Sequence, residues 1–258
     1  MKRKSLFVGA VLTAGLAMLS MGAAADAAIV QHSGSADPTT EGWTYSSVDG
    51  GNIGTGSIIN DNSSGFDAWY VNDHSTSPAN GYGLYRDSLT STDQTTLLGS
   101  DWVGSLRLRL PNANTAESGA VALDINLGTG NKRFLVYFGT NASADTKYQF
   151  YRTAGDGGNL FATNTGLDGR NYHLYELKYD HVSTTMDVYI DGNLYLAGWA
   201  GIGGNTLGGT NGGVSFGSGA GVATGQGNYN LVQVAVPEPA ALSLLGLGAL
   251  AGLRRRRR

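Results

Sequence analysis

Hydrophobic and polar side chains alternate along much of the chain with a period of two residues. Leu106, Leu108 and Leu110 alternate with Arg107 and Arg109. Because successive side chains of a β-strand point to opposite faces of a sheet, this pattern predicts half-buried antiparallel strands. The same alternation recurs in further segments: residues 121–127, 134–138, 173–179 and 186–190. The centre of the chain is therefore predicted to consist of short strands.

Turn-forming residues separate these strands, since the chain contains 40 glycines. Asp191-Gly192 lies between two alternating runs, where this dipeptide predicts a type I′ hairpin. Residues 92–98 predict a single short helix. The Gly-rich residues 201–227 predict surface loops flanking one strand at residues 213–217. No internal repeat or second domain is visible, and the pattern predicts one all-β domain.

The N-terminal segment has the composition of a secretory signal peptide. Lys2, Arg3 and Lys4 precede an apolar run at residues 6–21, and small residues continue to Ala28. A basic start, a short apolar middle and an A-x-A site define such a signal. Ala25-Asp26-Ala27 supplies the A-x-A, so cleavage is predicted between Ala27 and Ala28.

The C-terminal segment combines an apolar run at residues 240–253 with a terminal basic cluster. The apolar run rises only about 21 Å as a helix, whereas the hydrocarbon core is about 30 Å thick. Snorkelling arginines can supply part of the difference, and the positive-inside rule places them in the cytoplasm. The prediction is a hydrophobic membrane helix with the rest of the chain outside. The basic cluster comprises Arg254, Arg255, Arg256, Arg257 and Arg258.

The residues before this run resemble the PEP-CTERM sorting signal. Val236 is followed by Pro237, Glu238 and Pro239, then by the apolar run and the arginines, so all three parts of the signal occur in order. The resemblance implies processing by exosortase, a membrane-embedded transpeptidase-like enzyme, near the Pro-Glu-Pro. It also implies transient membrane anchoring and a cell-surface or extracellular-matrix location. The predicted division is signal peptide 1–27, body 28–235 and sorting tail 236–258, with signal peptidase and exosortase as processing partners.

The body resembles LamG-like domains of the concanavalin A-like lectin and glucanase superfamily. Residues 172–196 read YHLYELKYDHVSTTMDVYIDGNLYL, and this segment is similar to the central hairpins of those domains. The resemblance implies a single jelly-roll β-sandwich with its N-terminal and C-terminal strands side by side.

Charge and cysteine content exclude several function classes. The chain contains no Cys, so disulfides, thiolate metal sites and a cysteine nucleophile are excluded. Of 17 Lys and Arg, three lie in the signal and five in the tail; of 20 Asp and Glu, Asp26 and Glu238 lie outside the body. The body therefore carries nine basic and 18 acidic side chains. This sign argues against nucleic acid as a partner, because phosphates need a basic surface.

Two apparent nucleophile motifs fail on their context. Residues 213–217 fit G-x-S-x-G around Ser215, but that motif needs a following helix and a downstream His. The last histidine is His181, upstream of Ser215. Asp73-His74-Ser75 places three triad residue types together, yet neighbours on a strand point to opposite faces and cannot form a triad. No catalytic residue is predicted.

Carboxylate pairs and metal sites are equally weakly indicated. The body has three glutamates, Glu41, Glu117 and Glu176, and none begins the E-x-D-x-x-E type of motif that the resemblance associates with glucanases. The four histidines are His32, His74, His173 and His181. Their spacing is not that of a zinc site, and no metal ligand is predicted. No cofactor is predicted, although Asp/Asn-rich loops such as residues 60–62 leave room for a structural Ca²⁺.

Ligand binding is the remaining class of function. Sugars are held by aromatic faces together with amide and carboxylate groups, and the predicted ligand-binding residues are Trp69, Tyr70 and Trp199. Trp69 and Tyr70 are neighbours, so one points inward and the other outward if they lie on a strand. The hypothesis is a non-enzymatic surface or matrix protein whose body contacts extracellular polysaccharide or another surface protein. The alternatives are a glycan-active hydrolase or lyase, and a purely structural envelope component.

Overall fold

The computed structural model of the chain describes most of the body. Residues Asp26–Glu238 form one compact unit. Residues 1–26 of the predicted signal peptide and the sorting residues beyond Pro237 lie outside the described residues, as do the two flanking helices expected from the sequence, whereas Ala27 is the first residue of a strand. The described ranges are residues 27–47, 56–61, 65–73, 83–113, 121–128, 132–140, 146–151, 159–162, 166–202, 212–218 and 225–237.

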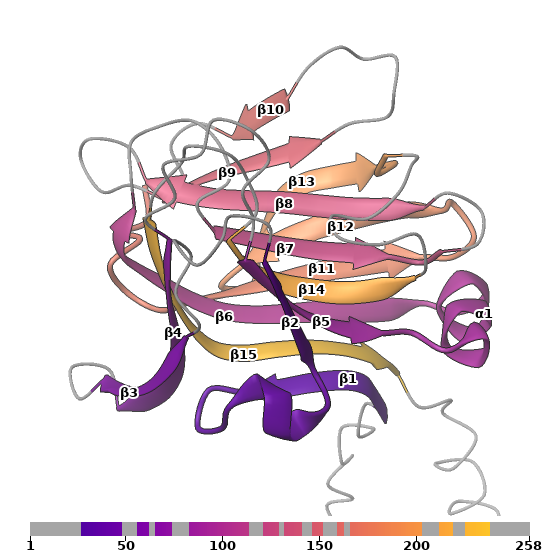
Figure 1. Cartoon of the computed structure of the whole chain (residues 1–258). Helices are drawn as coiled ribbons and strands as arrows, with labels where there is room; N and C mark the ends of the chain where they lie inside the picture. The colour runs from indigo at the N-terminus through magenta and orange to yellow at the C-terminus, as the bar shows by residue number, and fades with distance from the viewer. Residues whose placement is uncertain are drawn as a thin grey trace, which may run out of the picture. The chain divides into compact units, whose positions relative to one another are not determined.

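Two antiparallel sheets make up this unit (Figure 1). Sheet A has the strand order β13 (Asn193–Trp199), β12 (Thr185–Ile190), β11 (His173–Asp180), β6 (Trp102–Ala113), β15 (Gly225–Val236), β4 (Phe66–Asp73) and β3 (Ser57–Asp61), and β1 (Ala27–Ser33) also pairs with β15. Sheet B has the order β10 (Asn159–Ala162), β9 (Thr146–Tyr151), β8 (Arg133–Thr140), β7 (Val121–Asn126), β14 (Gly213–Ser218), β5 (Gly83–Ser88) and β2 (Thr44–Ser47). The all-β prediction is confirmed.

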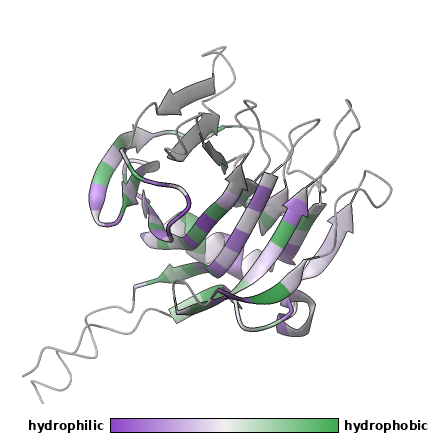
Figure 2. Cartoon of the chain, turned by 90° about the vertical axis from the view of Figure 1, so that its left-hand side faces the viewer, coloured by the Kyte–Doolittle hydropathy of each residue, from purple (hydrophilic) through white to green (hydrophobic). Residues whose placement is uncertain are grey.

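The two sheets pack face to face and bury the core between them. Leu106 and Leu108 of β6 are buried, whereas Arg109 lies on the opposite, outer face. A Cβ on Gly104 would lie 2.9 Å from Cδ1 of Ile125 in β7, so the sheets approach closely at this point. The alternation of hydrophilic and hydrophobic residues along the strands is visible in Figure 2. Burial of one face of each sheet provides the main stabilisation of the fold.

Aromatic rings join strands from both sheets at the end of the core near β1. The buried Phe216 of β14 lies at the centre, with ring centroids 4.9 Å from His32, 5.0 Å from Trp43, 5.4 Å from Tyr85 and 4.8 Å from Tyr229. His32 belongs to β1 and Tyr229 to β15, whereas Tyr85 belongs to β5. Aromatic pairs at these separations add stabilisation beyond their buried area.

The first and last strands of the body lie side by side, as predicted. β1 pairs with β15 from Ala27 opposite Val236 to Ser33 opposite Leu231. Val30 of β1 is buried in the core. The C-terminal end of β15 is therefore held by the N-terminal strand.

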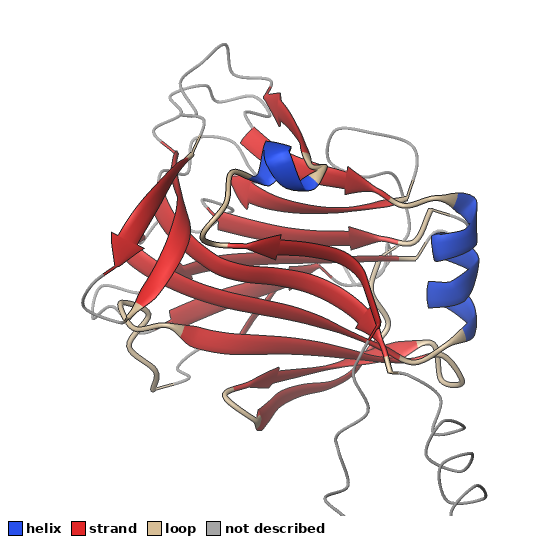
Figure 3. Ribbon diagram, turned by 90° about the horizontal axis from the view of Figure 1, so that it is seen from below, coloured by secondary structure: helices blue, strands red, loops and turns tan. Residues whose placement is uncertain are grey.

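Helix α1 (Ser91–Gly99) connects β5 of sheet B with β6 of sheet A and lies at the ends of the strands (Figures 1 and 3). Thr90 and Asp93 form a capping box: Asp93 N donates to Thr90 Oγ1 over 3.2 Å, and Thr90 N donates to Asp93 Oδ2 over 2.9 Å. Leu97 inserts into the core. The helix predicted at residues 92–98 is confirmed. The second helical element is the short 3-10 helix η1 (Pro38–Glu41). None of the helices in the described part of the chain has the length and apolarity needed to cross a membrane.

Two local predictions about turns and strands are confirmed. Asp191 and Gly192 have φ values of 49° and 78°, as a type I′ turn requires, and they link Ile190 to Asn193. The G-x-S-x-G segment forms β14, a strand in the interior of sheet B, and its Ser215 is buried. This segment is therefore a strand and lacks the strand-to-helix turn of a nucleophile elbow.

Candidate functional site

A pocket lies on the outer face of sheet A, where β3, β4, β15 and β6 run side by side. Its volume is about 280 Å³. Asn228 of β15 is paired with Arg109 of β6 on one side and with Tyr70 of β4 on the other, so these three side chains share the outer face. We call this site the outer-face pocket. Its lining residues are Ile59, Asn60, Asp61, Tyr70, Arg109, Pro111, Gln226 and Asn228.

The pairing of β6 with β15 is irregular at this position. The register shifts between Gln226 and Asn228, and shifts again between Tyr229 and Leu231. The backbone N–H of Leu110 donates to Gly169 O over 2.8 Å and not to β15. The next residue, Pro111, has no N–H to donate, and proline within a sheet is confined to such bulges and to edges. Bulges re-aim side chains and are frequent beside functional sites.

A buried ion pair forms the floor of the pocket. Arg109 Nη1 donates to Asp61 Oδ2, and Asn228 Nδ2 donates to the same oxygen over 3.2 Å. The side chain of Asp61 is 7% exposed and that of Arg109 is 22% exposed. A carboxylate only accepts hydrogen bonds, so the NH₂ group of Asn228 must face Asp61. The carbonyl Oδ1 of Asn228 then points elsewhere, and it has no hydrogen-bond partner among the described residues.

Tyrosines flank the ion pair. The Tyr172 hydroxyl is buried near Asn228 and Asp61, and its ring packs edge-on against Phe66 at 5.2 Å. Burial, together with the nearby Asp61 carboxylate, raises the pKa of Tyr172. Burial also raises the pKa of Tyr70. Both hydroxyls are therefore neutral at physiological pH and can donate as well as accept hydrogen bonds.

Of the three predicted ligand-binding residues, Tyr70 lies in the pocket and the two tryptophans do not. Trp69 is 4% exposed and packs edge-on against Tyr85 at 5.6 Å, inside the core. Trp199 is also 4% exposed, and its ring lies 5.2 Å from that of Phe134. Both indole rings therefore lack an exposed face for a sugar, and we do not retain them as ligand-binding residues. Trp69 points inward and Tyr70 outward, which agrees with the prediction that these neighbours point to opposite faces.

The other pocket residues carried only weak signals in the sequence. The alternation in residues 106–110 places Arg109 on the polar face of its strand, and Asp61 lies in a run of oxygen-rich side chains. Neither pattern indicates that Arg109 and Asp61 pair with each other. Asn228 carries no local signal, because its role depends on pairing with strands distant in sequence.

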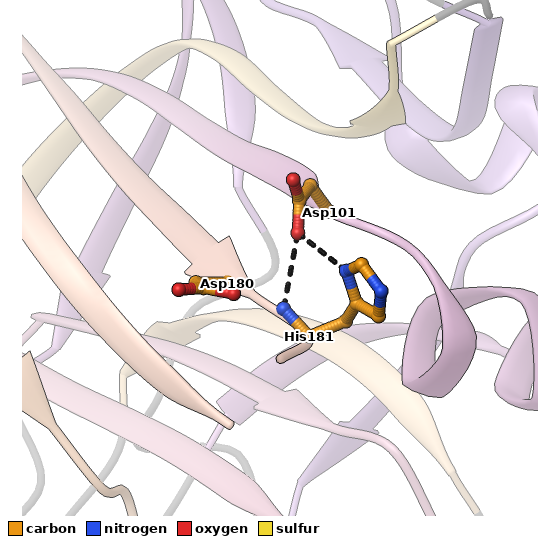
Figure 4. Close-up of side chains that lie close together, drawn as sticks. All are labelled: Asp101, Asp180 and His181. Carbon is orange, nitrogen blue, oxygen red and sulfur yellow. Dashed lines mark hydrogen bonds and ion pairs between the residues drawn. The ribbon is translucent and has the colours of Figure 1, made fainter. Parts of the chain in front are cut away.

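A second polar cluster lies at the turn between β11 and β12 (Figure 4). Potential ligand atoms of Asp101, Asp180 and His181 lie within 4.8 Å of one another. Asp101 Oδ1 is 2.7 Å from His181 Nδ1 and also accepts from His181 N over 3.0 Å, and these bonds lower the pKa of Asp101. Asp180 Oδ1 accepts from Val182 N over 2.8 Å. The carboxylates thus cap the exposed turn, and this structural role accounts for their positions.

Solved structures resemble this chain at low sequence identity. A carbohydrate esterase of Shiga toxin-encoding bacteriophage phi24B matches with a TM-score of 0.59 and 14% identity, covering 83% of this chain and 100% of the esterase. Bacillus licheniformis β-glucanase matches with a TM-score of 0.41 and 15% identity, over 74% and 91% of the two chains. Carbohydrate-binding module CBM66 from Bacillus subtilis matches with a TM-score of 0.39 and 12% identity, over 74% and 94%. The esterase match supports the fold, and the two packed antiparallel sheets confirm the predicted all-β sandwich.

The C-terminal segment matches a known family. Residues 235–258 match the model of the PEP-CTERM protein-sorting motif. This match confirms the resemblance seen in the sequence, and it implies export, processing by exosortase, and a surface or extracellular location. No curated protein matches the chain closely.

Proposed function

We propose that this protein is an exosortase-sorted component of the cell surface or extracellular matrix, whose β-sandwich binds carbohydrate without cleaving it. The single observation that supports the sorting part most strongly is the junction between fold and motif. The matched segment starts at residue 235, and β15 ends at Val236. The last strand of the sandwich therefore leads directly into the sorting signal.

The junction leaves the sandwich intact after processing. β15 is an interior strand of sheet A, and its last residue, Val236, pairs with Ala27, so signal cleavage after Ala27 removes one residue pair from the end of the ladder. The next residue, Pro237, is exposed and outside the strand. Proline cannot donate to a β ladder, so the Pro-Glu-Pro segment ends the sheet. Cleavage at or beyond Pro237 removes no residue from the ladder.

The outer-face pocket supports the carbohydrate-binding part of the proposal. Tyr70, Ile59 and Pro111 offer apolar contact, while Asn60 and Gln226 offer amide groups. Small-molecule sites generally combine an apolar lining with a few polar groups that fix orientation. This combination suits the C–H faces and hydroxyls of a sugar.

The pocket favours binding over hydrolysis. Glycoside hydrolysis generally uses two carboxyl groups on either side of the scissile bond. Among the described residues that line the pocket, Asp61 alone carries a carboxyl group, and it is paired with Arg109. A carboxylate held in an ion pair is a poor proton donor, because the neighbouring cation favours its ionised form.

Processing of the full chain in its producer tests the sorting part. We expect Glu238→Gln, or deletion of residues 254–258, to leave uncleaved precursor in the membrane fraction. Glu176→Gln is the matched control, because it also removes one carboxylate but lies on β11, far from the motif in sequence. Immunoblotting and intact mass measure the outcome. Unchanged release and mass in the Glu238→Gln and deletion variants would refute sorting through this motif.

Binding of the exported protein to a polysaccharide panel, including the producer's own exopolysaccharide, tests the second part. We expect saturable binding by calorimetry with no release of reducing ends or unsaturated sugars. Release of either product would instead favour the hydrolase or lyase alternative. Absence of binding throughout the panel would leave a purely structural envelope component.

A further inference from the structure

We infer that the outer-face pocket accepts one uncharged, hydroxyl-rich sugar residue and discriminates against uronic acids and other anionic sugars. This inference rests on the proposed carbohydrate binding and assigns a ligand class to it. The juxtaposition that supports it is an internally neutralised ion pair beneath a ring of neutral polar groups.

Charge balance is the first argument. Asp61 and Arg109 carry opposite charges and contact each other, and the remaining lining residues are uncharged. A carboxylate ligand that approached Arg109 would also lie beside Asp61. Like charges a few ångströms apart repel each other, so the anionic ligand would gain little from the guanidinium.

A second arginine near the pocket, Arg107, does not change the charge balance of the pocket. Arg107 lies on the same outer face of β6, but its guanidinium stacks over Phe66 at 5.0 Å and donates to Asn230 Oδ1 over 3.1 Å. Asn230 in turn donates to Asp67 O over 2.7 Å. These contacts hold Arg107 beside β4, and it is not among the residues that line the pocket.

The hydrogen-bonding groups match hydroxyls. Gln226 and Tyr70 each offer both donor and acceptor capacity. The Nδ2 of Asn60 donates one hydrogen bond to Asp67 Oδ1 over 2.8 Å, and an amide group has a second N–H and a carbonyl oxygen besides. A sugar hydroxyl also donates and accepts, whereas a carboxylate only accepts. A site built around such bidirectional groups leaves some of them unpaired when it holds an anion, and polar groups that a ligand covers without pairing reduce affinity.

The site is also rigid and small. Asn228 is 2% exposed and is fixed by its bond to Asp61, so the floor is in place before any ligand arrives. The volume of the pocket, about 280 Å³, lies just below the roughly 300–1,000 Å³ typical of pockets for drug-sized ligands. The pocket therefore suits one sugar ring, such as the end or a side group of a polysaccharide.

The experiment compares neutral and anionic polysaccharides on the exported, processed protein. The neutral arm contains a glucan, a galactan, a mannan and methyl-esterified homogalacturonan; the anionic arm contains alginate, hyaluronan and the same homogalacturonan after de-esterification. We expect at least one neutral polymer to bind ten-fold or more tightly than every anionic one in calorimetry at physiological salt. The esterified and de-esterified pair differ in charge on a common backbone, which isolates the effect of charge.

Two variants localise the effect. Asp61→Asn removes the negative charge beside Arg109, so we expect the preference to shift toward the anionic polymers by ten-fold or more. Tyr70→Ala removes a half-exposed ring, and we expect neutral binding to weaken at least ten-fold while the fold is retained. Glu176→Gln, on the same face of sheet A, is the control for loss of one carboxylate and should change neither preference nor affinity. Thermal unfolding checks that each variant is folded.

The outcomes separate the two proposals. Tighter binding of an anionic polymer by the unaltered protein would overturn the charge inference while leaving carbohydrate binding in place. Neutral binding that survives Tyr70→Ala would place the site elsewhere and would also overturn the inference. Absence of binding to every polymer would overturn both proposals.

Discussion

Ala27 and Val236 face each other at the end of the antiparallel ladder between β1 and β15. The predicted signal cleavage site, between Ala27 and Ala28, and the start of the sorting motif therefore border the same end of the sandwich. Cleavage at these two places would trim the ladder by one residue pair at most. The geometry makes both processing events compatible with an intact fold.

Removal of the sorting tail is expected to leave stability unchanged, whereas removal of the N-terminal strand is expected to lower it. A chain ending at Val236 should keep the urea unfolding midpoint of the full-length exported chain, because every residue of β15 remains. Further loss of residues 28–33 should lower the free energy of unfolding by at least about 3 kcal/mol, since burial of one large apolar side chain contributes about 1.5–3 kcal/mol and the ladder bonds are lost as well. Val30 and His32 are the buried side chains involved. Equal midpoints for the two truncated chains would contradict the assigned role of β1.

Glycine at the turn between β12 and β13 is expected to be required for its backbone conformation. Gly192 has φ +78°, and a Cβ there would meet no atom within 4 Å, so the cost of a side chain is conformational. We expect Gly192→Ala to lower the free energy of unfolding by about 1–2 kcal/mol, the cost of a left-handed L-residue. Gly99→Ala is the control: its surroundings are equally open, but its φ is not positive. Chemical denaturation should show no loss for Gly99→Ala, and an equal loss in both variants would contradict this explanation.

Local features of the fold could be predicted because they depend on neighbours in the sequence. The alternation in residues 186–190 and the following Asp191-Gly192 define a strand and its turn, and both occur as β12 and the type I′ hairpin. The opposite directions of Trp69 and Tyr70 follow from strand alternation in the same way. That alternation does not say which neighbour faces the core, and the structure places Trp69 there.

The pocket could not be predicted because its residues are distant in sequence. Asp61 is 48 residues from Arg109 and 167 from Asn228. They meet because β15 lies between β4 and β6, an order that the whole topology determines. The pocket also depends on the irregular register between β6 and β15 near Pro111, and no local sequence pattern specifies that register. Sequence reasoning identified the residue types for sugar binding but not their assembly.

Acid is expected to destabilise the protein through His32. The imidazole is fully buried, stacks on Phe216 at 4.9 Å, and its Nδ1 lies 2.5 Å from Glu41 Oε2. Burial lowers the pKa of His32 below the ordinary value of 6.5, although Glu41 opposes the shift. The unfolded chain therefore takes up a proton at higher pH than the folded chain. The contribution of His32 to stability is complete above pH 6.5 and is lost as the pH falls toward the lowered pKa.

The His32→Phe variant isolates this effect, because it keeps a ring against Phe216 but cannot titrate. We expect the free energy of unfolding to fall less steeply between pH 7 and pH 5 in His32→Phe than in the unaltered protein. Urea titrations at a series of pH values measure the two slopes. Parallel curves would show that protonation of His32 does not control the acid sensitivity.

The last prediction concerns how the ion pair between Asp61 and Arg109 contributes to stability, rather than to binding. Removing one partner of a buried pair leaves the other charge uncompensated and typically costs about 3–5 kcal/mol, whereas replacing both partners is often nearly neutral. Because Arg109 is 22% exposed, we expect Arg109→Met to cost about 3 kcal/mol, the lower end of that range. The double variant Asp61→Asn with Arg109→Met should recover more than half of this loss, since no charge remains buried. Urea unfolding of both single variants and the double variant gives the coupling energy directly. Losses that simply add would mean that Asp61 and Arg109 act independently, and the pocket floor would then not be the neutral unit on which its proposed preference for uncharged sugars depends.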